Sequence, residues 1–309
     1  NTGINEGLSV LTSNGTWKSF NLSPAVNQNV IGNIIIDSYN QKWIILPRGS
    51  GILVYNDNGT ILNQADDKIK KLTNTYGYGN LPSNEVTCIV EDLDGQIWLG
   101  TDKGIAVIYS PGNVFTNQNY DAQQILVDQD GYIAPLLETE YITAIAVDGA
   151  NRKWIGTKKA GVFLVSPDGT EQILNFTTDN SPLLDNGITS IAIDNNTGEI
   201  FFGTLKGIVS YKYTATSGGT SFDKVYAYPN PVRENYTGVI AIKGLTRNAN
   251  VKITDITGNL IYETTAEGGQ AIWNGKNFKG EKAKSGVYIV FCSNKDGTKT
   301  YVTKIFIIN

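Results

Sequence analysis

The sequence predicts an all-β protein, with a partial, open β-propeller of about four and a half four-stranded blades followed by a small immunoglobulin-like β-sandwich. Three observations support this prediction. A segment of three short strands and two tight turns repeats along the front part of the chain. Its apolar residues alternate or form β-branched runs, which favours strands over helices. A separate set of closely spaced short strands follows the repeats.

The clearest copy of the repeat is VTCIVEDLDGQIWLGTDKGIAVIY, residues 86–109. Asp94 and Gly95 suit a two-residue hairpin turn, because glycine and, to a lesser extent, aspartate tolerate positive φ. Trp98 lies in the second strand, and Gly104 opens the third. A meander of this size cannot bury both of its faces alone, so it requires neighbouring copies of itself.

Three further copies begin at Val30, Ile142 and Ile188. Each copy has an aromatic residue in its second strand and a glycine at the start of its third. The aromatic positions are Trp43, Trp98, Trp154 and Phe201, and the glycine positions are Gly51, Gly104, Gly161 and Gly207. Because the aromatic residues recur roughly every fifty residues, we predict that they pack between blades rather than bind a sugar.

Two other repeated positions are also interpreted as structural. An aspartate ends the first strand of each copy, at Asp37, Asp92, Asp148 and Asp194. A role that recurs in every blade is structural, so we predict that these carboxylates accept hydrogen bonds in the turns. A glycine precedes a threonine in the second strand at Gly100, Gly156 and Gly203, where we predict that a side chain would collide with the adjacent blade or distort a bulge.

Fourth strands are predicted at residues 60–64 and 170–176, each after an Asn-Gly or Asp-Gly turn. Residues 7–11 and 16–21 are similar to the two outer strands of a further blade whose inner strands are missing. We therefore expect the chain to be the C-terminal fragment of a longer protein. The blades are expected to form an open arc, since a usual ring has roughly six to eight of them.

Changes in residue composition along the sequence divide the chain into three parts. Residues 1–213 are assigned to blades, residues 214–224 to a small, polar linker, and residues 225–309 to a second domain. The YPNP motif at 228–231 cannot lie in a central strand, because proline donates no ladder hydrogen bond. Six or seven short strands in about eighty residues then indicate a β-sandwich.

Composition excludes several classes of function. The 309 residues include 25 basic and 29 acidic ones, which argues against a nucleic-acid surface. No apolar run is long enough for a transmembrane helix. The chain has no histidine, so Ser-His-Asp and Cys-His catalysis and most zinc sites are unavailable, and we predict no enzyme activity, cofactor or metal. Cys88 is predicted to be a buried apolar residue, and no bridge to Cys292 is expected.

One candidate ligand-binding cluster lies outside the repeats. Trp273 is followed by a loop that contains Lys276, Lys279 and Lys282. An aromatic ring flanked by lysines suits an anionic sugar or a phosphate. The alternative is a half-buried tryptophan beside a solvated lysine loop.

Two parts of the sequence resemble known families. The segments YPNPV, IKGL, VKITDITGNLIYET, GGQAIWNGKNFKGE, SGVYIVF and KIFII, within residues 225–309, resemble the C-terminal sorting domain of the type IX secretion system of Bacteroidota. The motifs WLGT, WIGT and FFGT resemble the two-component-regulator type of propeller repeat, from which WIILPRGSG in the first copy departs. Together with YDAQQILVDQDGY, they resemble a surface component of that secretion system in which a retained sorting domain follows propellers.

This resemblance implies a non-catalytic protein on the extracellular face of the outer membrane. Its implied partners are other type IX secretion outer-membrane proteins, and its implied place is where cargo is joined to anionic lipopolysaccharide, itself a candidate ligand. Two alternatives stay open. The chain could be a ligand-sensing propeller ectodomain, because the same repeats occur in hybrid histidine kinases. It could also be an exported enzyme or adhesin that carries the sorting domain as its secretion signal.

Overall fold

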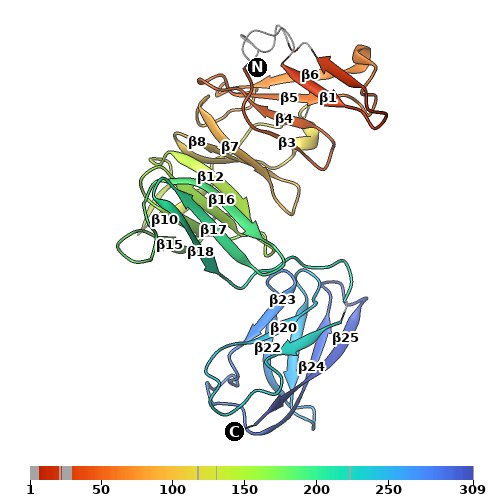
Figure 1. Ribbon diagram of the computed structural model, residues 1–309, viewed down its shortest axis with the longest axis vertical. Coiled ribbons are helices and arrows are strands. Elements are labelled where there is room, and N and C mark those ends of the chain that lie inside the picture. The colour runs from red at the N-terminus through yellow and green to blue at the C-terminus, as the bar shows by residue number, and fades with distance from the viewer. Residues whose placement is uncertain are drawn as a thin grey trace. The chain divides into compact units, whose positions relative to one another are not determined.

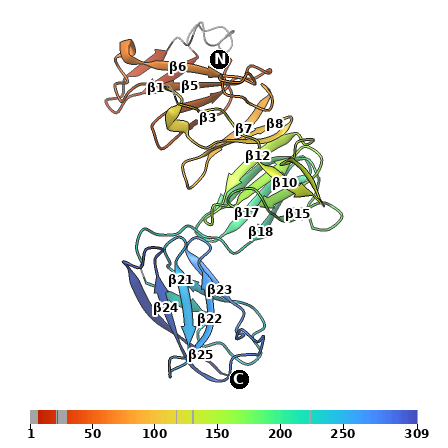
Figure 2. The same cartoon turned by 180° about the vertical axis from the view of Figure 1, so that it is seen from behind.

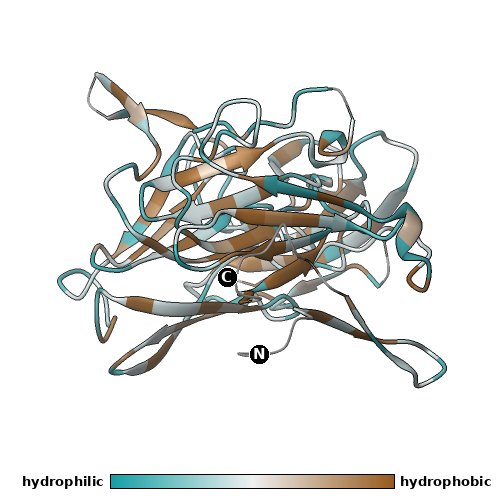
Figure 3. Cartoon of the chain, turned by 90° about the horizontal axis from the view of Figure 1, so that it is seen from above, coloured by the Kyte–Doolittle hydropathy of each residue, from teal (hydrophilic) through white to brown (hydrophobic). Residues whose placement is uncertain are grey.

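The computed structural model describes residues 7–20, 22, 30–116, 118–129, 131–222 and 224–308. Antiparallel strands make up almost all of its regular structure (Figures 1 and 2). Among the described residues, helical structure is confined to two 3₁₀ turns, η2 (Gln64–Asp66) and η3 (Pro111–Asn113). The all-β prediction is confirmed. Apolar residues concentrate in the strands and hydrophilic residues in the connecting loops (Figure 3).

The chain divides into two compact units. Unit 1 consists of Asn1–Ala146, Lys153–Ile191 and Phe202–Val209, and unit 2 consists of Val147–Arg152, Ala192–Phe201 and Ser210–Asn309. These units cut across the expected boundaries at residues 213 and 224, so those boundaries stay predictions.

Small antiparallel sheets follow one another along the blades. A four-stranded sheet contains β3 (Ile34–Ile36), β4 (Lys42–Ile45), β5 (Ile52–Asn56) and β6 (Lys68–Leu72). A three-stranded sheet contains β7 (Val86–Glu91), β8 (Ile97–Thr101) and β9 (Gly104–Ile108). The next four-stranded sheet contains β12 (Ile142–Val147), β13 (Lys153–Thr157), β14 (Val162–Val165) and β15 (Gln172–Phe176). The last, three-stranded sheet contains β16 (Ile188–Asp194), β17 (Glu199–Thr204) and β18 (Gly207–Lys212).

Two hairpins accompany these sheets. β1 (Leu8–Leu11) pairs with β2 (Trp17–Phe20), as predicted for the front of the chain. Its Phe20 is buried in one cluster with Tyr55 of β5. β10 (Leu126–Gln129) pairs with β11 (Tyr132–Pro135). No described strand of the first hairpin pairs with the last sheet, so strand pairing does not close the arc, in agreement with the prediction of an open propeller.

One predicted fourth strand is correct and one is wrong. β15 lies within the predicted segment 170–176. Residues 60–64, in contrast, form turns and the start of η2, and the fourth strand is β6. The reason is local, because the backbone N–H of Thr60 donates to Asp57 O and the Asn63 side chain accepts from Ala65 N. Such turn hydrogen bonds compete with a strand ladder.

The glycines that open the third strands have the conformation that the turn requires. Gly51 and Gly161 have φ values of 80° and 81°, in the left-handed region that favours glycine. A Cβ atom at Gly51 would collide with the carbonyl oxygen of Leu72, and one at Gly161 with that of Phe176. These carbonyls end the fourth strands, so the glycines allow close approach of the backbone within the blade.

Tryptophans form the packing between blades, as predicted. Trp43, Trp98 and Trp154 are fully buried, and Trp154 packs on Phe202 of the next sheet with ring centroids 5.6 Å apart. The same prediction for Phe201 is wrong, because that side chain is 38% exposed and Phe202 is the buried neighbour. Side chains alternate along a strand, so Phe201 and Phe202 lie on opposite faces of their sheet. Phe202 faces the preceding blade, where it meets Trp154. Phe201 faces the other way, and among the described residues no further blade sheet covers that face.

Unit 2 contains a two-sheet sandwich, as predicted. One sheet has β19 (Tyr226–Tyr228), β20 (Ile240–Lys243) and β23 (Gln270–Trp273). The other has β22 (Leu260–Thr265), β21 (Asn250–Thr254), β24 (Gly286–Ser293) and β25 (Thr300–Ile307). Inward side chains of both sheets form one core, which includes Ile242, Trp273, Val251, Val290 and Ile305.

Candidate functional site

The repeated aspartates hold the turns of the blades, which confirms their predicted structural role. Oδ1 of Asp37 accepts the backbone N–H of Gln41 at 2.7 Å, and its Oδ2 accepts the indole N–H of Trp43 at 2.8 Å. Asp92 bonds the indole of Trp98 in the same way, at 3.1 Å. The carboxylate therefore connects the turn, through hydrogen bonds, to the tryptophan that packs between blades. Asp148 and Asp194 each accept the backbone N–H two positions later.

A buried ion pair joins two blades of unit 1. Nζ of Lys153 lies 2.8 Å from Oδ2 of Asp92, with side-chain exposures of 0% and 1%. The ammonium also donates to the carbonyl oxygen of Pro167 and lies 4.2 Å from the ring centroid of Trp98. Burial opposes ionisation of Asp92, but hydrogen bonds from Lys153 and from the backbone amide of Gln96 hold the pKa of Asp92 below its usual value. The pair has no exposed surface, so it is structural. Sequence reasoning missed it, although a lysine within a buried apolar strand was a signal.

Trp273 is a core residue, which corrects its predicted role in ligand contact. Its side chain is fully buried, and its indole N–H donates to Lys276 O at 2.8 Å. The physical reason is alternation along β23, which directs the ring into the sandwich, where its centroid lies 5.7 Å from that of Tyr288. The indole positions the lysine loop from inside and offers no face to a ligand.

The lysines of that loop are exposed and lie close together. Lys276 forms an isolated antiparallel bridge with Lys282, so the two adjoin across the loop. Lys282 also donates from Nζ to Glu234 O at 3.2 Å. Lys279 lies at the exposed tip. Contact of Lys276, Lys279 and Lys282 with an anionic ligand stays a prediction.

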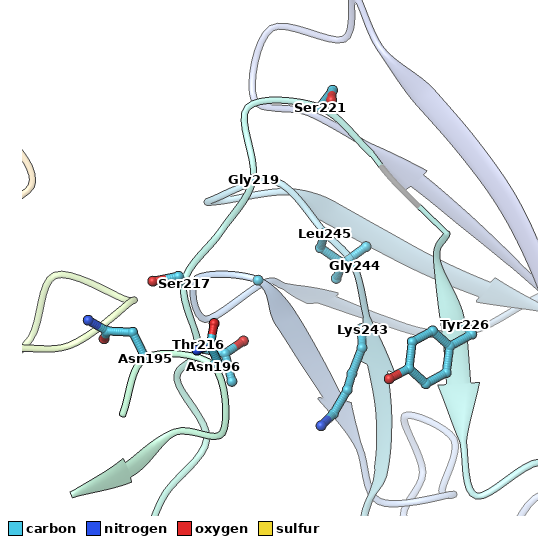
Figure 4. A pocket seen from close by; sticks show the side chains of 11 residues that line it. Asn195, Asn196, Thr216, Ser217, Gly219, Ser221, Tyr226, Lys243, Gly244 and Leu245 are labelled. Carbon is cyan, nitrogen blue, oxygen red and sulfur yellow. The ribbon is translucent and has the colours of Figure 1, made fainter. Parts of the chain in front are cut away.

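A polar hollow of about 290 Å³, which sequence reasoning did not find, lies in unit 2 (Figure 4). Cross-strand neighbours Tyr226 and Lys243 form one side, and Figure 4 shows the phenol oxygen directed toward the lysine side chain. Asn196 and Thr216 lie on the other side, nearer the turn that joins β16 and β17. These residues are far apart in sequence, so no motif connects them.

The floor of the hollow is held by backbone hydrogen bonds. Gly269 N donates to Thr216 O at 2.8 Å, Leu245 N donates to Gly269 O at 2.9 Å, and Gly219 N donates to Leu245 O at 3.2 Å. A Cβ atom at Gly269 would collide with the backbone of Ser217. The two segments therefore approach more closely than any other residue at that position would allow.

Contacts of Arg152 tie together the segments near Thr216. Arg152 is 2.8 Å from Asp148 and 3.3 Å from Glu267, and its guanidinium lies 4.6 Å from the ring centroid of Tyr213. Thr216 N donates to Glu267 O at 3.4 Å. The turn at Asp148, the segment at Thr216 and the turn before β23 are thus tied together within unit 2.

Comparison with known proteins agrees with the two kinds of structure. Residues 226–309 match the secretion system C-terminal sorting domain family, and residues 80–103 match the two component regulator propeller family. Among solved structures, the chain is similar to PorZ, described as an essential bacterial surface component of the type-IX secretion system of human oral-microbiomic Porphyromonas gingivalis. Sequence identity is 31% over 96% of this chain and 41% of that chain, with a TM-score of 0.62. This chain is PorZ-like.

The PorZ-like chain spans less than half the length of the protein that it matches. The extracellular domain of a putative one component system from B. thetaiotaomicron also aligns, with 14% identity over 96% of this chain and 40% of that chain and a TM-score of 0.46. No curated protein matches the chain in sequence. Within the described residues, no helix has the length and apolar character needed to cross a membrane, and no group of three or more potential metal ligands occurs.

Proposed function

We propose that this chain belongs to a non-catalytic component of a type IX secretion system, located on the extracellular face of the outer membrane. The observation that carries the proposal is the combination of a sorting domain with regulator-type blades, at 31% identity to PorZ over 96% of this chain. The partners proposed are other outer-membrane proteins of the same system. Its sorting domain is a working part of the mature protein.

The exposed lysine loop is proposed to meet anionic lipopolysaccharide. Lys276, Lys279 and Lys282 present three ammonium groups around a loop that the buried Trp273 holds in place. Contacts between lysines and a polyanion are screened over a Debye length of roughly 8–10 Å, so binding should weaken as salt rises.

The experiment has two parts. Mass spectrometry of protein taken from its native cell surface should find residues 225–309 still attached to the blades, without a covalent link to lipopolysaccharide. A lipopolysaccharide pull-down at low and at high salt should then lose most of its signal in the triple variant Lys276→Gln, Lys279→Gln, Lys282→Gln. The matched control changes three exposed lysines of the blades, Lys68, Lys103 and Lys159, to glutamine, with the same loss of charge.

Two results would contradict the proposal. Protein truncated near residue 225 and covalently joined to lipopolysaccharide would identify exported cargo that uses the sorting domain as its secretion signal. Equal losses in the loop variant and in the control variant would show that net charge, rather than the lysine loop, governs the interaction.

A further inference from the structure

The hollow between β19, β20 and the segment at Thr216 presents polar groups that the protein itself does not use. Lys243 Nζ and the Tyr226 hydroxyl have no hydrogen-bond partner among the described residues, and neither does the amide of Asn196. The Thr216 hydroxyl is also unpartnered within the described part of the chain, although this residue is only 7% exposed. Tyr226 is 52% exposed, Asn196 is exposed and Lys243 is half-buried, so these groups reach solvent and are open to a ligand that enters the hollow.

The charge of the hollow favours an anion. Lys243 is the charged side chain of the described lining, and no described lining residue is acidic. An ammonium group bonds a carboxylate or phosphate more strongly than a neutral acceptor, because the hydrogen bond is charge-assisted. The neighbouring phenol and amide can donate to, and accept from, hydroxyl groups of the same ligand.

The size and rigidity of the hollow favour a small ligand. Its volume of about 290 Å³ lies near the lower end of small-molecule sites, which are roughly 300–1,000 Å³. Its floor is fixed by backbone hydrogen bonds between Gly269, Thr216 and Leu245, so binding requires little ordering of the main chain. The lining is rich in hydroxyl, amide and glycine groups rather than in apolar side chains, which suits a hydroxylated ring.

We propose that this hollow binds a single hydroxyl-rich anion of one-sugar size, with Lys243 holding its acidic group and Tyr226, Asn196 and Thr216 holding its hydroxyls. The acidic group is a carboxylate, as in a uronic acid, or a phosphate, as in a sugar phosphate. The site is distinct from the lysine loop and goes beyond the proposed role in secretion, because it recognises one ring rather than a polymer.

The test is a titration of the full chain with glucuronate, glucose 1-phosphate and glucose, followed by ligand-observed NMR and calorimetry. Both anions, or one of them, should bind, and glucose should bind at least tenfold more weakly. Lys243→Gln should weaken anion binding about tenfold, which corresponds to roughly 1.4 kcal/mol. Thr216→Val, which replaces a hydroxyl with a methyl group of similar size, should weaken it as well. Circular dichroism of each variant checks that it is folded.

Lys279→Gln is the matched control, because it removes the same charge from the lysine loop and leaves the hollow unchanged. It should bind both anions as the parent chain does. Preference for glucuronate or for glucose 1-phosphate assigns the acidic group. Absence of binding by both anions at millimolar concentration overturns the proposal, as does unchanged binding in Lys243→Gln. Because lipopolysaccharide pull-down by the loop variant is measured separately, failure of one proposal is distinguishable from failure of the other.

Discussion

The ion pair between Asp92 and Lys153 gives a sharp prediction for stability. In Lys153→Met, the Asp92 carboxylate stays buried and keeps its hydrogen bonds from Gln96 N and Trp98 Nε1 but loses its cation. Removal of one partner of a buried pair costs about 3–5 kcal/mol, and the remaining donors put this variant near the lower end of that range. In Asp92→Asn, the buried ammonium loses its anionic partner and retains Pro167 O and the face of Trp98, so we expect a loss of at least the same size.

The assay is thermal unfolding followed by a reporter for each unit. For a unit of this size, about 3 kcal/mol corresponds to a fall of roughly 6–12 °C in the melting temperature. Because the chain has two units, a thiol reagent reports on each: labelling of Cys88 follows unit 1 and labelling of Cys292 follows unit 2, and mass spectrometry of the peptides distinguishes the two. The control is Lys206→Met, which breaks a surface pair with Asp185 and should leave the melting temperature nearly unchanged.

The pH dependence supplies an independent check. The pKa of Asp92 is lowered in the folded chain, so its contribution is fully present above the unfolded pKa of about 4 and disappears as pH falls through the folded value. The difference between the parent and Lys153→Met should therefore be constant from pH 5 to pH 8 and shrink below about pH 4. A Lys153→Met variant no less stable than Lys206→Met would refute the reasoning. So would effects of Asp92→Asn and Lys153→Met that simply add in the double variant, because partners in one pair must couple.

Three other predictions follow from local geometry. Gly156→Ala should destabilise by about 1–3 kcal/mol, since its Cβ would lie 2.7 Å from Ile188 Cγ2 of the next blade. A Cβ at Gly203 would meet the hydroxyl oxygens of Ser190 and Thr189, which can rotate away, so Gly203→Ala should be near neutral. Equal melting temperatures for the two variants would contradict close packing between blades. Burial raises the pKa of Cys88 and Cys292 to about 12, so neither thiol should react with a disulfide reagent at pH 8 until urea unfolds the chain, and rapid reaction of the native protein would refute their burial. Side-chain hydrogen bonds in the turn lower the pKa of Asp255 to about 2, and NMR should show its carboxyl ionised down to that pH, whereas titration near 4 would contradict the turn geometry.

The sequence predicted those features that local chemistry determines. The recurrence of aspartate at one position in every copy predicts a turn role for Asp37 and Asp92, and their bonding partners do lie within six residues. Gly51 and Gly161 were identified because a turn needs their conformation. Such signals lie within one hairpin, so they can be recognised without knowledge of the neighbouring blades.

Features that depend on distant segments were not predictable. Phe201 and Phe202 are adjacent phenylalanines, and which of them is buried depends on the sheets that flank β17. Trp273 is followed by a polar, lysine-rich loop, and its burial follows only from the pairing of β23 within the sandwich. The hollow draws its lining from residues between Asn195 and Gly269, which only the folded chain brings together.

The bond from aspartate to indole also bears on the order in which blades form. It joins residues only six positions apart, as in Asp37 with Trp43 and Asp92 with Trp98. Loops of about ten residues close in roughly 10–100 ns, far faster than contacts between distant segments. Each inner hairpin can therefore form its turn, and fix the orientation of its tryptophan, before the next blade begins to fold. The array can then grow blade by blade, each one presenting an oriented ring as the template for its successor.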